Sequence, residues 1–142
     1  MNAATMAKAT RIALAFVFLA AAPQKIAAPA DFAASIASYL ILPDALINFT
    51  ALVLPWLEIV VAFMLLCLVW TGMALFLANA MLAAFLAAIV SAYLRGIDIS
   101  CGCFSTSAAA SDDMIWYMAR DGVFLAVGLI AAWLHRGGRH ND

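Results

Sequence analysis

The sequence has few charged residues and almost no histidine. Only 11% of its 142 residues are Asp, Glu, Lys or Arg, and the formal net charge is −1. This balance provides no basic face for nucleic acid, and the chain has no glycine-rich nucleotide-binding motif. Both histidines, His135 and His140, lie near the C-terminus, which leaves little for a histidine-based catalytic or haem site. Any chemistry must therefore depend on cysteine and on the few charges inside apolar segments.

Apolar residues, by contrast, are abundant. They make up 68% of the chain, and the mean hydropathy is +1.08, which is more than a water-soluble domain of this size can bury. Four stretches are long enough to cross a bilayer as helices, at about residues 6–28, 45–68, 73–94 and 114–134. The sequence therefore predicts an all-α membrane protein, a bundle of four transmembrane helices that forms one domain over residues 1–142.

The first predicted span has a second interpretation. Lys8 and Arg11 precede a short apolar run that ends in small residues, as in a signal peptide. Pro23 would directly follow the cleavage point, which disfavours cleavage. We therefore expect an uncleaved helix, kinked at Pro23, with Lys25 near its far end extending to the lipid headgroups.

A short helix is predicted between the first two spans. Asp31 is a suitable N-cap for a helix over Phe32–Leu40. Phe32 and Leu40 share one face with Ile36, so this helix is expected to lie along the membrane surface. The alternative is a plain connecting loop. Asp44, after a proline, repeats the same stop-and-cap signal.

Two charges lie inside predicted spans. Glu58 is the only glutamate and falls in the second span, while Arg120 falls in the fourth. Each is costly in lipid alone, so we expect the two to pair and lock the bundle, with proton handling or quinone binding as the alternative. Asp121 would point about 100° away from Arg120 on a helix. It is therefore expected to face Lys25 or to be protonated.

Two of the three cysteines lie in the polar segment Arg95-Gly96-Ile97-Asp98-Ile99-Ser100-Cys101-Gly102-Cys103-Phe104, between the third and fourth spans. A disulfide between Cys101 and Cys103 would close a small, strained ring, and strain makes such a bond labile. Gly102 tolerates the backbone torsions that this ring needs. This pattern indicates redox or soft-metal chemistry, and the alternative is an inert pair that stiffens the loop.

Neighbouring residues bear on the reactivity of this pair. Arg95 would favour the thiolate form of either cysteine, whereas Asp98 would oppose it. The third cysteine, Cys67, lies at the opposite end of the second span and is expected to be a packed apolar residue.

The positive residues predict the orientation. Lys8 and Arg11 flank the first span, and Arg136 and Arg139 follow the fourth, whereas both intervening polar loops contain more aspartate than lysine or arginine. By the positive-inside rule both termini are cytoplasmic. The cysteine loop then faces the periplasm, where thiols are readily oxidised and exchanged.

The order of these motifs resembles the MauE branch of the DoxX-like membrane proteins. The similar features, in chain order, are Lys25, Leu42-Pro43, Leu54-Pro55-Trp56-Leu57-Glu58, residues 95–104 and Arg120. The family pattern reads CGCFG followed later by an Arg-Asn pair, whereas here Ser105 follows Phe104 and Asp121 follows Arg120. Both cysteines remain in place.

The resemblance implies a bacterial inner-membrane protein that helps to mature the disulfide-rich small subunit of a periplasmic methylamine dehydrogenase, beside a thioredoxin-like partner. No cofactor is expected. We predict that Cys101 and Cys103 carry out thiol–disulfide exchange with a periplasmic partner or client. Supporting roles are expected for Lys25, Glu58, Arg95, Gly102, Phe104 and Arg120.

Two other functions fit the same residues. Cys101 and Cys103 could bind Cu(I), with Met114 and Met118 as thioether ligands one helical turn apart. Methionines at that spacing are, however, more often packing residues. The protein could also be a non-catalytic membrane scaffold for a partner, in which case the cysteines would be dispensable.

Overall fold

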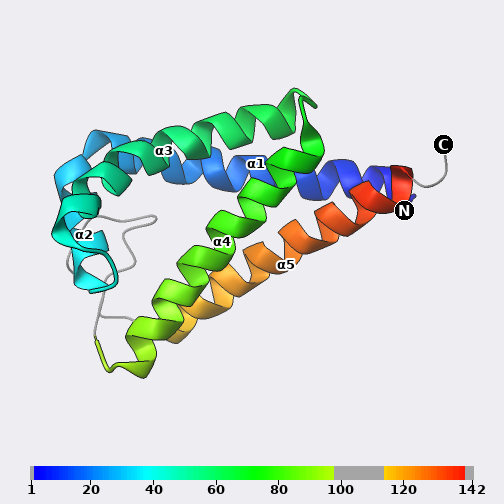
Figure 1. The fold of residues 1–142 in the computed structure, drawn as a ribbon. Coiled ribbons are helices and arrows are strands. Elements are labelled where there is room, and N and C mark those ends of the chain that lie inside the picture. Colours follow the sequence, from blue (N-terminus) through cyan, green and yellow to red (C-terminus); the bar gives the residue numbers. More distant parts are fainter. Residues whose placement is uncertain (1, 98–113, 140–142) are drawn as a thin grey trace.

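A computed structural model describes residues 2–97 and 114–139, and these residues form five helices (Figure 1). The helices are α1 (Ala3–Ala27), α2 (Pro29–Ser38), α3 (Asp44–Leu66), α4 (Thr71–Leu94) and α5 (Met114–Arg139). All except α2 are long and apolar enough to cross a membrane. The all-α, four-span fold predicted from the sequence is therefore confirmed.

The boundary between α3 and α4 lies slightly earlier than predicted. Helix α3 ends at Leu66, and the turn that follows places Leu68 and Trp70 at φ angles of 61° and 45°. These left-handed conformations end a helix, because residues other than glycine adopt them only singly. At the other end of the chain α5 continues to Arg139, past the predicted end at Leu134. Pro23 lies inside α1.

The short helix α2 forms, but its predicted cap is wrong. The helix begins at Pro29 with Ala28 as its N-cap, and Asp31 lies in its first turn without a capping hydrogen bond. Proline is favoured at the first helical position because its fixed φ suits the helix and it has no N–H to leave unpaired. Asp44 likewise lies in the first turn of α3, after the N-cap Pro43. Both carboxylates still suit the positive ends of their helices.

The four long helices are arranged in a ring in which each contacts two neighbours. Helix α1 packs against α3 and α5, and α4 packs against α5 and α3. Helices α3 and α5 therefore lie diagonally across the bundle, as do α1 and α4. Figure 1 shows that the α1/α3 and α4/α5 pairs converge where α3 turns into α4 and diverge towards α2. We call these the turn end and the loop end.

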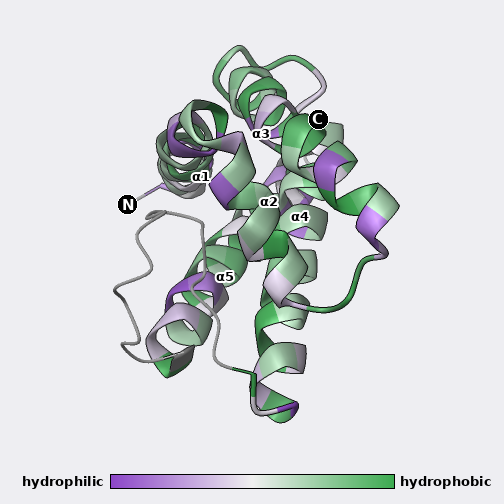
Figure 2. Cartoon of the chain, turned by 90° about the vertical axis from the view of Figure 1, so that its left-hand side faces the viewer, coloured by the Kyte–Doolittle hydropathy of each residue, from purple (hydrophilic) through white to green (hydrophobic). Residues whose placement is uncertain are grey.

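Both described termini lie at the turn end (Figure 1). Seen from the loop end, the long helices consist mostly of hydrophobic residues, with short hydrophilic stretches between (Figure 2), and many of their large apolar side chains are exposed. Such surfaces suit lipid rather than water. The position of α2 relative to a membrane surface remains a prediction.

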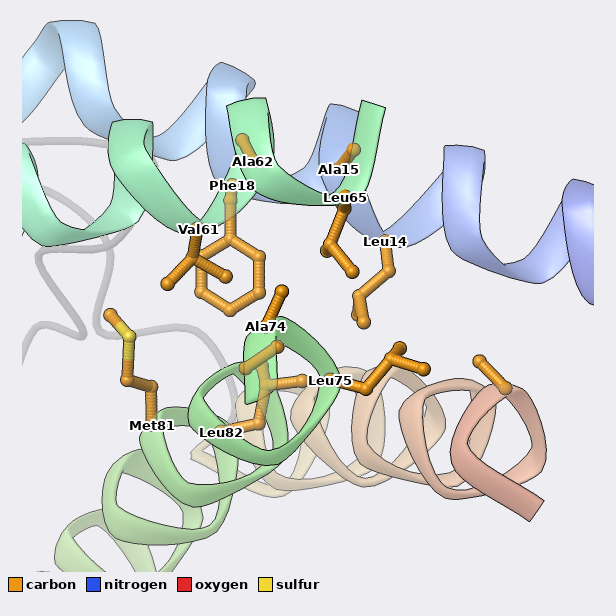
Figure 3. Packing of buried hydrophobic residues seen from close by; sticks show 12 residues of the cluster. Leu14, Ala15, Phe18, Val61, Ala62, Leu65, Ala74, Leu75, Met81 and Leu82 are labelled. Atoms are coloured by element: carbon orange, nitrogen blue, oxygen red, sulfur yellow. The ribbon is translucent and has the colours of Figure 1, made fainter. Parts of the chain in front are cut away.

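The core lies towards the turn end, where small residues allow close approach of the helices. Figure 3 shows α1 and α3 side chains, including Phe18 and Val61, directed towards α4. Ala62, Ala74 and Ala78 are fully buried and permit tight packing there. The other buried members of this cluster are Leu14, Ala15, Leu65, Leu75, Met81, Leu82 and Ala131.

Candidate functional site

Lys25 and Glu58 form an ion pair inside the bundle. Lys25 Nζ donates a hydrogen bond to Glu58 Oε1, and the side chains are only 1% and 2% exposed. The rings of Phe32 and Phe85 each lie 5.1 Å from Nζ, close enough for cation–π attraction. The ammonium group is thus surrounded by one carboxylate and two aromatic faces.

The predicted extension of Lys25 to the headgroups is therefore wrong. Side chains on a helix lean towards its N-terminus. Near the end of α1 this direction leads back into the bundle, where Glu58 lies on the adjacent helix α3. An ion pair within the protein replaces the contact with the headgroups.

Arg120 and Asp121 form a second ion pair. The Arg120 guanidinium donates to Asp121 Oδ1 from Nη2 at 3.0 Å and from Nε at 3.2 Å. It also lies 5.3 Å from the centre of the Tyr117 ring, one turn earlier on α5. Adjacent helical residues point in different directions. The long arginine side chain is nevertheless able to fold across to its neighbour's carboxylate.

These pairs correct the predicted pairing of Glu58 with Arg120. Because α3 and α5 are diagonal in the ring and make no close backbone contact, Glu58 is satisfied by Lys25 from α1 instead. Asp121 pairs with Arg120 and not with Lys25. The four residues still meet around a cavity of about 30 Å³ at the centre of the bundle, which Phe85 of α4 also lines. We refer to Lys25, Glu58, Arg120 and Asp121 as the charge cluster.

The charge cluster is formally neutral, with two cations and two anions. A single charge at the centre of a membrane helix costs about 2.5–3.5 kcal/mol, so mutual pairing is what makes these residues tolerable. One atom is less well satisfied: Glu58 Oε2 is buried and has no hydrogen-bond partner among the described residues. The adjoining cavity has room for about one water molecule.

Arg95 joins the end of α4 to the end of α2. Its Nη2 donates to the Tyr39 carbonyl and its Nη1 to the Leu40 carbonyl, the latter at 3.3 Å, while Nε donates to Ser91 O at 3.2 Å. The last described residue before the cysteine loop, Ile97, donates its N–H to Ala92 O at 3.0 Å. We call these three Arg95 contacts the Arg95 clasp. It fixes the point at which the loop leaves the bundle.

Tyr39, Ile89 and Ala92 form a small apolar cluster beside the Arg95 clasp, and Ile97 and Met118 pack against it. Met118 is thus a packing residue, half-buried in the loop end. Residues 98–113, which include Cys101, Gly102, Cys103 and Phe104, and the side chain of Met114 lie outside the described part of the chain. Their predicted roles remain sequence-based.

Cys67 is not packed, contrary to expectation. It is exposed in the turn after α3, where α3 has ended and no helix covers it. It lies at the turn end, whereas the cysteine loop begins at the loop end.

Several contacts at this site could not be predicted from the sequence. The acceptors of Arg95 are backbone carbonyls, which carry no residue-specific signal. Phe32 and Phe85 look like ordinary apolar residues until the fold brings them to Lys25. An apolar cavity of about 440 Å³ also lies between α2, α3 and α4 near the loop end, and Phe85 lines it as well as the charge cluster.

These features define the class of the protein. It is a multi-pass membrane protein that has a ring of four long helices, a formally neutral charge cluster at its centre, and two cysteines separated by one glycine in the segment after its third span. The family model described as methylamine utilisation protein MauE matches residues 3–134. The chain therefore belongs to the MauE family, which confirms the resemblance seen in the motifs.

A curated relative agrees with this assignment. The chain is 39% identical over 97 residues to methylamine utilization protein MauE of Paracoccus denitrificans. The alignment covers 68% of this chain and 52% of the relative, so the chain spans about half the length of that protein. No solved structure matches the chain.

Proposed function

We propose that this protein is an accessory membrane protein of methylamine utilisation that supports thiol–disulfide exchange on a periplasmic client. Methylamine dehydrogenase is the proposed client, and a thioredoxin-like protein is the proposed partner. The role in methylamine utilisation rests on the family. The exchange chemistry rests on Cys101 and Cys103 and on the way the fold anchors their loop.

The observation that carries the proposal is the Arg95 clasp. It ties the end of α4 to the end of α2 through the carbonyls of Tyr39 and Leu40. Cys101 follows Ile97 by four residues in the sequence. The sequence thus tethers the two cysteines close to a fixed point of the bundle. A reactive group that must meet its partner in the same way each time needs such a rigid support.

Charge distribution supports a periplasmic position for the loop end. Lys8 and Arg11 on α1 and Arg136 on α5 all belong to the turn end, at which both described termini lie. The positive-inside rule places that end in the cytoplasm. The loop end, at which the segment containing Cys101 and Cys103 begins, then faces the oxidising compartment.

The proposed exchange is balanced without a cofactor. A thiolate of the pair attacks the disulfide of the partner, forms a mixed disulfide and releases the partner's second sulfur as a thiolate. The other cysteine, as its thiolate after losing its proton to solvent, then attacks the mixed disulfide. This closes the Cys101–Cys103 bond and releases the reduced partner. Two electrons pass from the pair to the partner, and the reverse sequence passes them back.

The charge cluster has a structural role in this proposal. It contains side chains from α1, α3 and α5, with Phe85 of α4 at its edge. Paired charges at the centre define how the diverging helices sit, and thereby hold the loop end in shape. No step of the exchange passes through it.

Trapping of mixed disulfides tests the proposal. Cys101→Ala and Cys103→Ala variants, each expressed with a thioredoxin-like partner and with methylamine dehydrogenase, should accumulate a reducible conjugate through the remaining thiol. Cys67→Ala is the matched control and should trap nothing beyond the wild type. If neither variant captures either protein, the exchange role is wrong, and full amine-dependent growth of a Cys101→Ser/Cys103→Ser double variant would instead favour a scaffold.

A further inference from the structure

A cleft at the turn end lies between α4 and α5 and has a volume of about 430 Å³. It is separate from the charge cluster and from the Arg95 clasp. One end of the cleft is cationic because Arg136 lines it, with His135 beside it, and the rest is largely apolar, lined by Leu75, Phe76 and Leu129. The proposed thiol chemistry makes no use of it.

Among the described residues, no acidic side chain pairs with the two basic ones at this end of the cleft. Among the residues that the structure describes, neither His135 nor Arg136 has an ion pair, and every described carboxylate lies at the loop end or in the charge cluster. The imidazole ring of His135 packs over the start of α4, with Nε2 at 3.6 Å from the position that a Cβ on Gly72 would occupy. The positive end of the α4 dipole adds to the potential at this point.

The apolar side of the cleft is exposed. Phe76 and Leu129 are 66% and 56% exposed, and both belong to segments that cross the membrane. Trp133, which is 74% exposed, lies between them and the cationic end. Tryptophan at such a level is typical of the membrane interface, because its ring is apolar and its N–H can donate a hydrogen bond.

We propose that this cleft binds one anionic phospholipid of the leaflet at the turn end. The phosphate lies against Arg136 and His135, and the acyl chains lie along Phe76 and Leu129. A membrane lipid fits better than a free phosphate ion because the site joins a cationic end to an exposed apolar groove, and only a lipid uses both. Basic pockets between transmembrane helices bind anionic headgroups in this way.

Native mass spectrometry of the full chain in detergent tests the proposal. The probes are phosphatidylglycerol, phosphatidylcholine with the same acyl chains, and inorganic phosphate. We expect phosphatidylglycerol to bind in preference to phosphatidylcholine, and excess inorganic phosphate not to displace it. Arg136→Gln should weaken phosphatidylglycerol binding about fivefold, as expected for the loss of one cation at a lipid headgroup.

Two matched variants control for charge and folding. Lys8→Gln removes one positive charge at the same end but outside the cleft, and should bind like the wild type. Arg136→Lys should retain most of the binding. Equal binding of the two lipids, unchanged binding by Arg136→Gln, or equal losses in Arg136→Gln and Lys8→Gln would overturn the site. Displacement by inorganic phosphate would show a free-anion site and contradict the lipid. Melting temperatures measured without added lipid serve as the folding control and should be alike in all variants. If Arg136→Gln melts at a lower temperature than the wild type, His135→Gln is used in its place, and it should also weaken phosphatidylglycerol binding.

Discussion

The two ends of the bundle are stabilised differently. At the turn end, alanines such as Ala62 and Ala74 allow α1, α3 and α4 to pack closely around an apolar core. Towards the loop end the helix pairs diverge, and polar contacts join them: the charge cluster at the centre of the bundle and, beside the small apolar cluster around Tyr39, the Arg95 clasp. The turn end depends on the close fit of small side chains, whereas the centre and the loop end depend on a few directional contacts. The segment that contains the thiol pair starts at the end that depends on them.

The largest effect is expected from breaking the Lys25–Glu58 pair. Glu58→Leu leaves the Lys25 ammonium buried without its carboxylate, and removal of one member of a buried pair costs about 3–5 kcal/mol. The double variant Lys25→Met/Glu58→Leu removes both charges and should recover most of the lost stability. Reversible unfolding of the full chain in mixed micelles measures these differences.

Asp44→Asn is the control for this cycle, because Asp44 is exposed in the first turn of α3. It removes only a favourable charge at the start of the helix and should change stability by less than about 1 kcal/mol. A Glu58→Leu variant as stable as Asp44→Asn, or a double variant less stable than either single variant, would show that the loop end does not depend on this pair.

The next largest effect tests the close contact between α4 and α5. Asn79 Nδ2 donates to Gly128 O at 3.0 Å, and a Cβ on Gly128 would lie 2.5 Å from Asn79 Oδ1. Gly128→Ala must therefore displace the amide, and overpacking of this kind costs about 1–3 kcal/mol. The same unfolding measurement applies.

Gly122→Ala provides the matched comparison on the same helix. A Cβ at Gly122 meets nothing within 4 Å. Because alanine favours a helix over glycine, this change should be neutral or stabilise by up to about 1 kcal/mol. Equal effects of the two alanines would mean that α4 and α5 are less closely packed at Asn79 than the structure shows.

These contacts also show how far sequence reasoning reaches. Glu58, Arg120 and Lys25 stand out in the sequence because charges in apolar runs demand a reason. Their partners depend on the helix order in the ring, which places α1 between α3 and α5, and no periodicity in the sequence specifies that order. Four spans follow from hydropathy alone. The contribution of Cys101 and Cys103, by contrast, still rests on the sequence and the family.

A smaller effect separates two roles for Arg95. If Arg95 acts by its charge on the thiols, as the sequence suggests, Arg95→Lys should keep the alkylation rate of Cys101 and Cys103. If it acts through the Arg95 clasp, lysine lacks the planar fork that serves the carbonyls of Tyr39 and Leu40 together, and hydrogen bonds worth about 1–3 kcal/mol are weakened at the loop end. We expect the second result: Arg95→Lys and Arg95→Met should change the alkylation rate alike. A rate that is normal in Arg95→Lys and altered only in Arg95→Met would favour the charge.

The smallest effect is expected from substitution of the third cysteine, Cys67. A negligible effect would confirm that the turn end, where Cys67 lies, takes no part in the thiol chemistry proposed for the loop end. Cys67 is exposed in the turn after α3 and makes no core contact, so Cys67→Ser should change stability by less than about 0.5 kcal/mol. It should also leave the yield of mixed disulfides from Cys101→Ala unchanged, because Cys67 lies at the opposite end of the bundle.

A membrane-impermeant maleimide should label Cys67 in inverted vesicles, and Cys101 and Cys103 in intact spheroplasts. Labelling of all three from one side would contradict the proposed orientation, since an odd number of membrane crossings separates Cys67 from the cysteine loop in a four-span fold.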